Sequence, residues 1–250
     1  MNLEKIYNEE DLFPREITRY EKRDYGLLFY NEENKESYDS NHAIIYENQS
    51  TNLSHVLDDI LEFYKGKGIK PIIYQSICDD GYFERIKSDL WDYGFESFSE
   101  IQKYMVLSAE STIIPNGEII VQKVSEWKNE YGVEIFEKAG EPWEIDVVKN
   151  ALNNSNTLFF VAFYKDKPVG MTHCHVTDYV CRVDYLLVSK EYRNIGVGRA
   201  LINCFVEYCR TNGIENCYLW PDGETAEKIY YEAGFRLVDI KKAGRAAYSR

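Results

Sequence analysis

A glycine-containing segment in the C-terminal half has the residue types of a phosphate-binding site. It consists of Arg193, Asn194, Ile195, Gly196, Val197, Gly198 and Arg199. It follows a strand-like segment over residues 183–188 and opens an apolar helical stripe. Glycine lets the backbone approach a bulky anion closely, and the unpaired N–H groups at a helix start attract phosphate. We therefore expect residues 193–199 to hold a pyrophosphate.

The spacing of the glycines distinguishes among phosphate-binding motifs. A dinucleotide-binding loop needs a third glycine three residues after the second, but that position is Leu201. A P-loop needs Gly-Lys followed by Ser or Thr, whereas Gly198 is followed by Arg199 and Ala200. The pattern that remains is Arg193-x-x-Gly196-x-Gly198 at the end of a strand.

A second motif follows at Ala226-x-x-Ile229-Tyr230-x-x-x-Gly234-Phe235. In order and spacing the two motifs together resemble the acetyl-CoA signature and the following helix of the GNAT superfamily of N-acetyltransferases. The resemblance covers residues 118–250. It implies an α/β fold with a mixed sheet, acetyl-CoA as co-substrate, and direct transfer of the acetyl group to a primary amine. Gly223 stands where the family often has asparagine.

The resemblance also implies roles for single residues. The strand ending at Val188 should offer backbone groups of Leu186, Leu187 and Val188 to the pantetheine arm of the cofactor. Tyr230 should protonate the departing thiolate, because a phenol of pKa about 10 and a thiol of pKa about 8.5 are close enough for proton donation to help.

Asp184 is the candidate base that deprotonates the amine, directly or through water. Alternation along the strand predicts that its side chain shares a face with Leu186 and Val188. The alternative is a structural carboxylate held by hydrogen bonds.

No metal site is expected. His173 and His175 share a strand face but lack a third ligand in the sequence, so both are expected to be ordinary sheet residues. None of the six cysteines forms a CxxC pair, and five of them follow residue 170. This distribution is typical of reduced cysteines in an intracellular protein core.

The chain repeats an order of elements, which indicates two related domains. The first copy has an apolar helix over residues 53–64, a strand over 71–74 and a helix ending at Gly94-Phe95. The second copy has the same three elements over residues 197–208, over 217–220 and before Gly234-Phe235. Both glycines fit helix C-caps. In the first copy, residues 48–53 contain no glycine and Leu90 occupies the position of Tyr230. The first copy therefore has no phosphate loop.

Pro115 and the turn-forming Asn116-Gly117 place a boundary near residues 108–117. We expect a degenerate GNAT-like domain over residues 1–112 and an acetyl-CoA-binding GNAT catalytic domain over residues 113–250. The second should contain strands over 118–124, 158–164 and 181–188, with helices around 126–138 and 144–152. The basic end, residues 241–250, should form a solvated hairpin.

Composition narrows the partners. The net charge of −13 disfavours binding of nucleic acid, which needs a basic surface. No apolar run is long enough to cross a membrane. The polar N-terminus lacks the apolar core of a signal peptide. We expect a cytoplasmic monomer or homodimer. The acidity fits a cationic small-molecule acceptor, or serves solubility alone. The alternative hypothesis is a non-catalytic acyl-CoA-binding module with a regulatory or protein-interaction role. The presence of Tyr230 favours an enzyme over this alternative, because binding alone does not need the Tyr230 hydroxyl.

Overall fold

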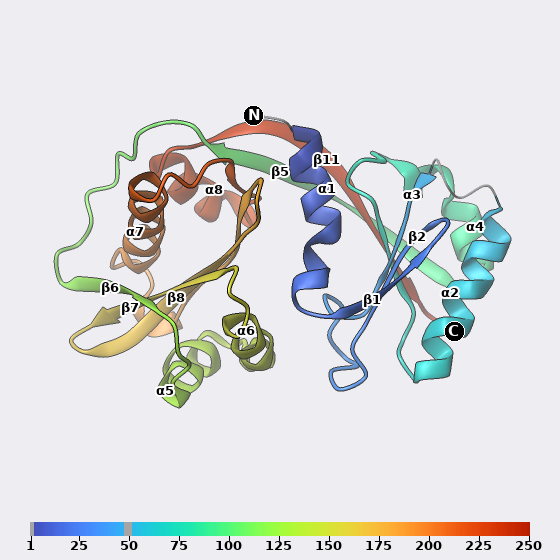
Figure 1. Cartoon of the computed structure of the whole chain (residues 1–250), viewed down its shortest axis with the longest axis horizontal. Coiled ribbons are helices and arrows are strands. Elements are labelled where there is room, and N and C mark those ends of the chain that lie inside the picture. The colour runs from blue at the N-terminus through green and yellow to red at the C-terminus, as the bar shows by residue number, and fades with distance from the viewer. Residues whose placement is uncertain (1–2, 48–51) are drawn as a thin grey trace. The chain divides into compact units, whose positions relative to one another are not determined.

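The computed structural model describes residues 3–47 and 52–250, which form two compact units (Figure 1). The C-terminal unit consists of Lys103–Asp239, and the N-terminal unit combines the residues up to Gln102 with Ile240–Arg250. Each unit is a mixed α/β structure, as the sequence predicts. Residues 48–51, part of the glycine-free segment of the first copy, lie outside the described residues.

The C-terminal unit has the sheet order β5-β10-β9-β8-β7-β6. Strands β6 to β9 are antiparallel neighbours, β9 and β10 are parallel, and β10 is antiparallel to β5. Its elements are the end of β5 (Phe95–Leu107), β6 (Ile119–Val124), α5 (Asn129–Tyr131), η3 (Gly132–Glu137, a π-helical turn), η4 (Pro142–Glu144), α6 (Ile145–Leu152), β7 (Thr157–Tyr164), β8 (Lys167–Val176), β9 (Cys181–Val188), η5 (Lys190–Tyr192), α7 (Val197–Thr211), β10 (Cys217–Leu219), α8 (Gly223–Glu232) and the start of β11 (Phe235–Tyr248).

Helices cover both faces of this sheet (Figure 1). On one face, α7 places Leu201 and Phe205 against Phe160 of β7 and Val183 of β9. On the other, Phe136 of η3 and Val148 of α6 pack against Phe159 and Met171. Strand β7 is buried on both faces, as its apolar run predicts. We call these the α7 face and the α6 face.

The N-terminal unit has the sheet order β1-β2-β3-β4-β11-β5. The predicted helical stripe is buried in α2, where Val56, Leu57, Ile60 and Tyr64 form part of the core. Its elements are α1 (Leu3–Leu12), η1 (Phe13–Glu16), β1 (Arg19–Arg23), β2 (Gly26–Tyr30), β3 (Ala43–Ile45), α2 (Leu53–Lys67), β4 (Ile72–Gln75), α3 (Tyr82–Arg85), α4 (Lys87–Asp92), the start of β5 and the end of β11.

The two units repeat one arrangement. In each, a strand is followed by a helix and a parallel strand: β3, α2 and β4 in one unit, and β9, α7 and β10 in the other. The next helix ends at a glycine with positive φ, 87° at Gly94 and 105° at Gly234. Both glycines therefore adopt the left-handed conformation that the C-cap interpretation requires.

The strand after each repeat ends in the other unit. Strand β5 leaves the first repeat, and its end pairs with β10, Val106 opposite Tyr218. Strand β11 leaves the second repeat, and its end pairs with β4, Ala246 opposite Ile73. The basic end is thus part of one long strand, so the expected hairpin is wrong. Residues 240–250 belong to the N-terminal unit, whereas the sequence had assigned them to the second domain.

Among the described residues, no helix is both long and apolar enough to cross a membrane.

Candidate active site

A β-bulge in β9 determines the position of Asp184. In the antiparallel pairing with β8, His173 lies opposite Tyr185 and Cys174 lies opposite Val183, so Asp184 is the extra residue. A bulge of this kind interrupts the regular alternation of side chains. Bulges occur often beside active sites, where they redirect a side chain.

The bulge makes one sequence expectation wrong. Val183 belongs to the core of the α7 face, and Leu186 and Val188 pack against it. Asp184 instead contacts His173, whose ring lies 6.1 Å from that of Tyr185, a residue packed on the α6 face. Asp184 and Leu186 therefore lie on opposite faces, because the bulge restarts the alternation between them.

Two basic side chains hold Asp184. The Arg182 guanidinium forms an ion pair with one carboxylate oxygen, and His173 Nε2 lies 3.3 Å from the other. Burial lowers the pKa of His173 well below its usual value, so the ring is neutral at physiological pH. Burial likewise lowers the pKa of His175 to about 3. Arg182 and Asp184 are two residues apart on one strand, and this spacing could have predicted their ion pair from the sequence.

The structure supplies a third group to the two histidines. The candidate ligand atoms of His173, His175 and Asp184 all lie within 4.8 Å of one another. The Arg182 guanidinium, however, occupies one oxygen of the Asp184 carboxylate. The positive charge of Arg182 repels a metal ion at this position. His173, His175 and Asp184 are therefore better explained as two histidines beside a structurally held carboxylate than as a metal site.

The parallel ladder between β9 and β10 is short. Its partners are Cys181 with Cys217 and Arg182 with Tyr218. Among the described residues, the ladder between β9 and β10 ends at Arg182, while the pairing of β9 with β8 continues to Val188. At Leu186, Leu187 and Val188, backbone groups on the β10 side of β9 can therefore bind an extended ligand. The resemblance predicts that the backbone groups of Leu186, Leu187 and Val188 bind the pantetheine arm along this strand.

The loop after β9 presents backbone N–H groups at the start of α7. Asn194 and Gly196 have positive φ, 67° and 96°. Gly196 is the N-cap of α7 and has no side chain to satisfy the first N–H groups. Asn116 Nδ2 donates to the Ile195 carbonyl at 3.0 Å and so holds the loop. Left-handed turns beside a helix start form a concavity suited to anions.

The other residues of the loop occupy different environments. The Arg193 guanidinium donates to the Val188 carbonyl at 3.3 Å, at the end of β9. Val197 is buried under Gly170, where a Cβ would lie 2.8 Å from the Val197 side chain. Arg199 forms a two-pronged ion pair with Glu232 of α8, with N–O distances of 2.6 and 3.2 Å. Its side chain thus ties α7 to α8.

Gly198 lies on the side of α7 that faces β9. A Cβ at this position would meet Leu186 at 3.5 Å, Ile229 at 3.9 Å and Val188 at 4.0 Å. These are ordinary contact distances. The backbone of Gly198 is therefore close to the free stretch of β9.

Tyr230 of α8 lies on the α7 face. Its ring centroid is 6.1 Å from that of Phe235, and it packs against the core of this face. Burial raises the pKa of its phenol to about 12, with a smaller contribution from nearby Cys174. Cys174 lies opposite Val183, next to the bulge.

Sequence comparison identifies the C-terminal unit. Residues 121–235 match the sequence model of the acetyltransferase (GNAT) family. An uncharacterized N-acetyltransferase from Methanocaldococcus jannaschii is 30% identical over 93 residues, which are 34% of this chain and 41% of that protein. The chain thus spans about two fifths of the length of this curated relative.

Solved structures resemble more of the chain. A GCN5-related N-acetyltransferase from Kribbella flavida has a TM-score of 0.69 at 12% identity, covering 98% of this chain and 95% of that one. A functionally unknown protein from Staphylococcus epidermidis has a TM-score of 0.65 at 16% identity, covering 93% and 95%. A tandem GNAT protein from the clavulanic acid biosynthesis pathway has a TM-score of 0.58 at 11% identity, covering 84% and 76%.

At these identities the structural likeness shows the fold. The mixed sheet and its covering helices thus have the fold of these N-acetyltransferase structures. Residues 121–235 form a GNAT family acetyltransferase domain. The GNAT family uses acetyl-CoA as co-substrate.

Proposed function

We propose that the protein is an N-acetyltransferase that passes the acetyl group of acetyl-CoA directly to a primary amine. The observation that carries the proposal is the early end of the β9–β10 ladder at Arg182 and Tyr218. Leu186, Leu187 and Val188 of β9 then have no β10 partner among the described residues, and they lead to the anion-binding start of α7. A pantetheine arm is an extended chain with amide groups, which such an edge can bind.

The cofactor is proposed to follow β9. Backbone groups of Leu186, Leu187 and Val188 bind the pantetheine amides, and the N–H groups of residues 193–199 bind the pyrophosphate. Asn194, Ile195 and Gly196 form the turn, and Val197 and Gly198 begin the helix. Arg193 contributes a positive charge after leaving the Val188 carbonyl. The side chain of Arg199 supports the site through its ion pair with Glu232, and only its backbone N–H faces the pyrophosphate.

The chemistry is proposed to take place beside the bulge. Asp184 reaches the reacting amine from the α6 face and removes its proton, directly or through water. Tyr230 reaches the sulfur from the α7 face and donates to the departing thiolate. An acid and a base on opposite faces fit a reaction in which the amine and the thiol are on opposite sides of the acetyl carbon.

The acceptor is proposed to be a small cationic amine, since the chain carries a net charge of −13. The N-terminal unit is proposed to be a degenerate GNAT-like domain that does not bind CoA itself. We propose a cytoplasmic monomer or homodimer, in keeping with six cysteines that form no disulfide among the described residues.

Release of CoA thiol from acetyl-CoA, followed in the presence of an amine library, tests the proposal. The library should include polyamines, aminoglycosides, amino acids and peptide N-termini. At least one amine should accelerate thiol release and gain one acetyl group by mass spectrometry. Tight acetyl-CoA binding without amine-dependent release across the library would instead favour the non-catalytic acyl-CoA-binding module.

A further inference from the structure

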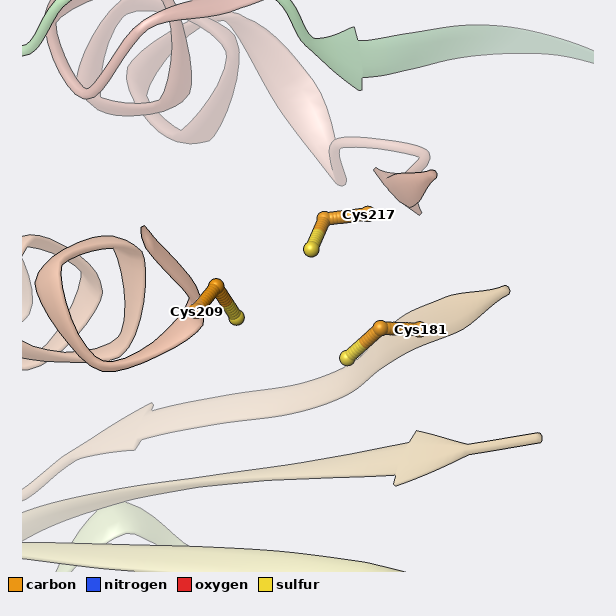
Figure 2. Close-up of side chains that lie close together, drawn as sticks. All are labelled: Cys181, Cys209 and Cys217. Atoms are coloured by element: carbon orange, nitrogen blue, oxygen red, sulfur yellow. The ribbon is translucent and has the colours of Figure 1, made fainter. Parts of the chain in front are cut away.

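Buried cysteines from separate elements meet in the C-terminal unit. Cys181 of β9, Cys209 of α7 and Cys217 of β10 are each no more than 1% exposed. Their side chains point toward a common centre (Figure 2). Cys174 of β8, also fully buried, belongs to the same hydrophobic core cluster. We call these residues the thiol cluster.

The spacing of the sulfurs suits a single ion. The Sγ atoms of Cys181, Cys209 and Cys217 all lie within 4.8 Å of one another. Tetrahedral zinc with Zn–S bonds of about 2.3 Å separates its sulfurs by about 3.8 Å. Closing these three sulfurs around zinc therefore requires each pair to approach by at most about 1 Å. Small rotations about the side-chain torsions of cysteine can supply such a shift.

The chemistry of the donors selects the ion. Thiolates are soft ligands that prefer zinc among the abundant divalent cations, whereas magnesium and calcium prefer oxygen. The cysteines are free thiols rather than disulfides. Four cysteine sulfurs are the ligand set of one class of structural zinc site.

We propose that Cys181, Cys209 and Cys217 bind one zinc ion in the core of the C-terminal unit. Cys174 is not among the three sulfurs that meet within 4.8 Å, and on ion binding it would approach to become the fourth sulfur. The ion would be bound as the chain folds, because the cluster is closed to solvent and binding free energy then contributes to folding. It would join β9 and β10 where they pair, Cys181 opposite Cys217, and fix α7 against both. This proposal is independent of acetyl transfer.

Refolding the metal-free full chain in the presence of increasing Co²⁺ tests the site. We expect one Co²⁺ per chain, with intense thiolate-to-cobalt charge-transfer absorption that one equivalent of Zn²⁺ removes. Zinc at about 100 times its Kd should raise the Tm by about 5 to 10 °C. Absence of the charge-transfer band in the wild type would overturn the proposal and leave the cysteines as packing residues.

Cysteine variants locate the ion. Cys217→Ala and Cys209→Ala should each weaken cobalt binding by about tenfold or more. Cys204→Ala, on α7 but outside the cluster, and the exposed Cys78→Ala are matched controls that should bind normally. Circular dichroism without metal shows whether each variant folds, and Cys217→Ser serves where Cys217→Ala does not. An unchanged spectrum in the folded cluster variants, or an equal loss in the controls, would contradict the assignment.

Discussion

The two candidate catalytic side chains differ in their surroundings, and the difference suits opposite roles. Tyr230 lies among apolar side chains of the α7 face, where burial favours the neutral phenol that a proton donor needs. Asp184 lies on the α6 face, where its carboxylate forms an ion pair with the Arg182 guanidinium.

Replacing Tyr230 with phenylalanine removes the proton donor and keeps the ring. We expect kcat to fall by about 100- to 10,000-fold, the usual range for loss of a general acid, with acetyl-CoA affinity nearly unchanged. Since the Tyr230 pKa is about 12, its deprotonation should not limit the wild-type rate between about pH 6 and pH 10. Steady-state kinetics and calorimetry measure both effects.

Tyr231→Phe is the matched control, because Tyr231 is the next residue of α8 and is 57% exposed. It should retain the wild-type rate. Turnover of Tyr230→Phe within about threefold of wild type would make Tyr230 a packing residue and leave water as the acid.

Replacing Asp184 with asparagine removes the base and keeps the shape of the side chain. We expect kcat/KM to fall by about 100- to 10,000-fold. The Tm should also fall, because Arg182 loses its charged partner. Acetyl-CoA affinity separates the two effects and should stay near that of the wild type.

Asp178→Asn, an exposed carboxylate in the turn between β8 and β9, provides the comparison and should be fully active. If Asp184→Asn loses stability but turns over at the wild-type rate, Asp184 is the structural carboxylate of the alternative interpretation.

At the scale of elements, the anion site depends on close packing among β8, β9 and α7. Gly170 lets α7 approach β8, since a Cβ there would lie 2.8 Å from Val197 and 2.9 Å from the Leu187 carbonyl. Gly196 supplies the left-handed turn at the helix start. The packing of α7 against β8 and β9 therefore determines the position of the loop before α7. The side chains of the loop contribute less to that position.

Gly198→Glu tests the loop. The substitution places a carboxylate near Leu186 and Val188, where the cofactor phosphates and pantetheine are expected. Acetyl-CoA should raise the Tm of the wild type, because a ligand of the native state alone stabilises it. That shift should vanish in Gly198→Glu through lost space and charge repulsion.

Gly66→Glu makes the same change at an exposed helical glycine of α2 with no atom within 4 Å of a Cβ. Its thermal shift with acetyl-CoA should equal that of the wild type. An undiminished shift in folded Gly198→Glu would show that residues 193–199 do not hold the cofactor.

At the scale of the whole molecule, exchanged strands make each unit depend on both halves of the chain. The core of the C-terminal unit includes Met105 of β5, and that of the N-terminal unit includes Ala246 of β11. A division of the sequence at one point therefore removes a strand from a sheet.

A fragment of residues 115–250 lacks β5 and exposes the edge of β10 that pairs with Val106. We expect this fragment to aggregate or to be inactive, because an uncovered strand edge invites association. Size-exclusion chromatography and the thiol assay measure both properties. Residues 95–250, which restore β5, form the control, and full activity of the shorter fragment would show that β5 is dispensable.

Calorimetry of the full chain should give one acetyl-CoA per chain. The first copy has no glycine over residues 48–53 and has Leu90 in the position of Tyr230. A stoichiometry near two would mean that the N-terminal unit binds the cofactor by another route.

The sequence by itself determined the local features of this protein. The spacing of apolar residues predicted α2, α7 and β7, which is buried on both faces. This spacing indicates which face of a helix or strand packs against the rest of the protein. The glycines before Phe95 and Phe235 indicated the left-handed caps, since only glycine adopts that conformation without cost. The two motifs also identified the acetyltransferase family.

The tertiary structure alone decided which residues meet. The bulge moved Asp184 away from Leu186, because one extra residue in β9 is visible only against its partner strand. The exchange of β5 and β11 and the convergence of Cys181, Cys209 and Cys217 likewise depend on residues far apart in the chain. Sequence periodicity reports burial within one element, whereas pairing and convergence are properties of several elements packed together.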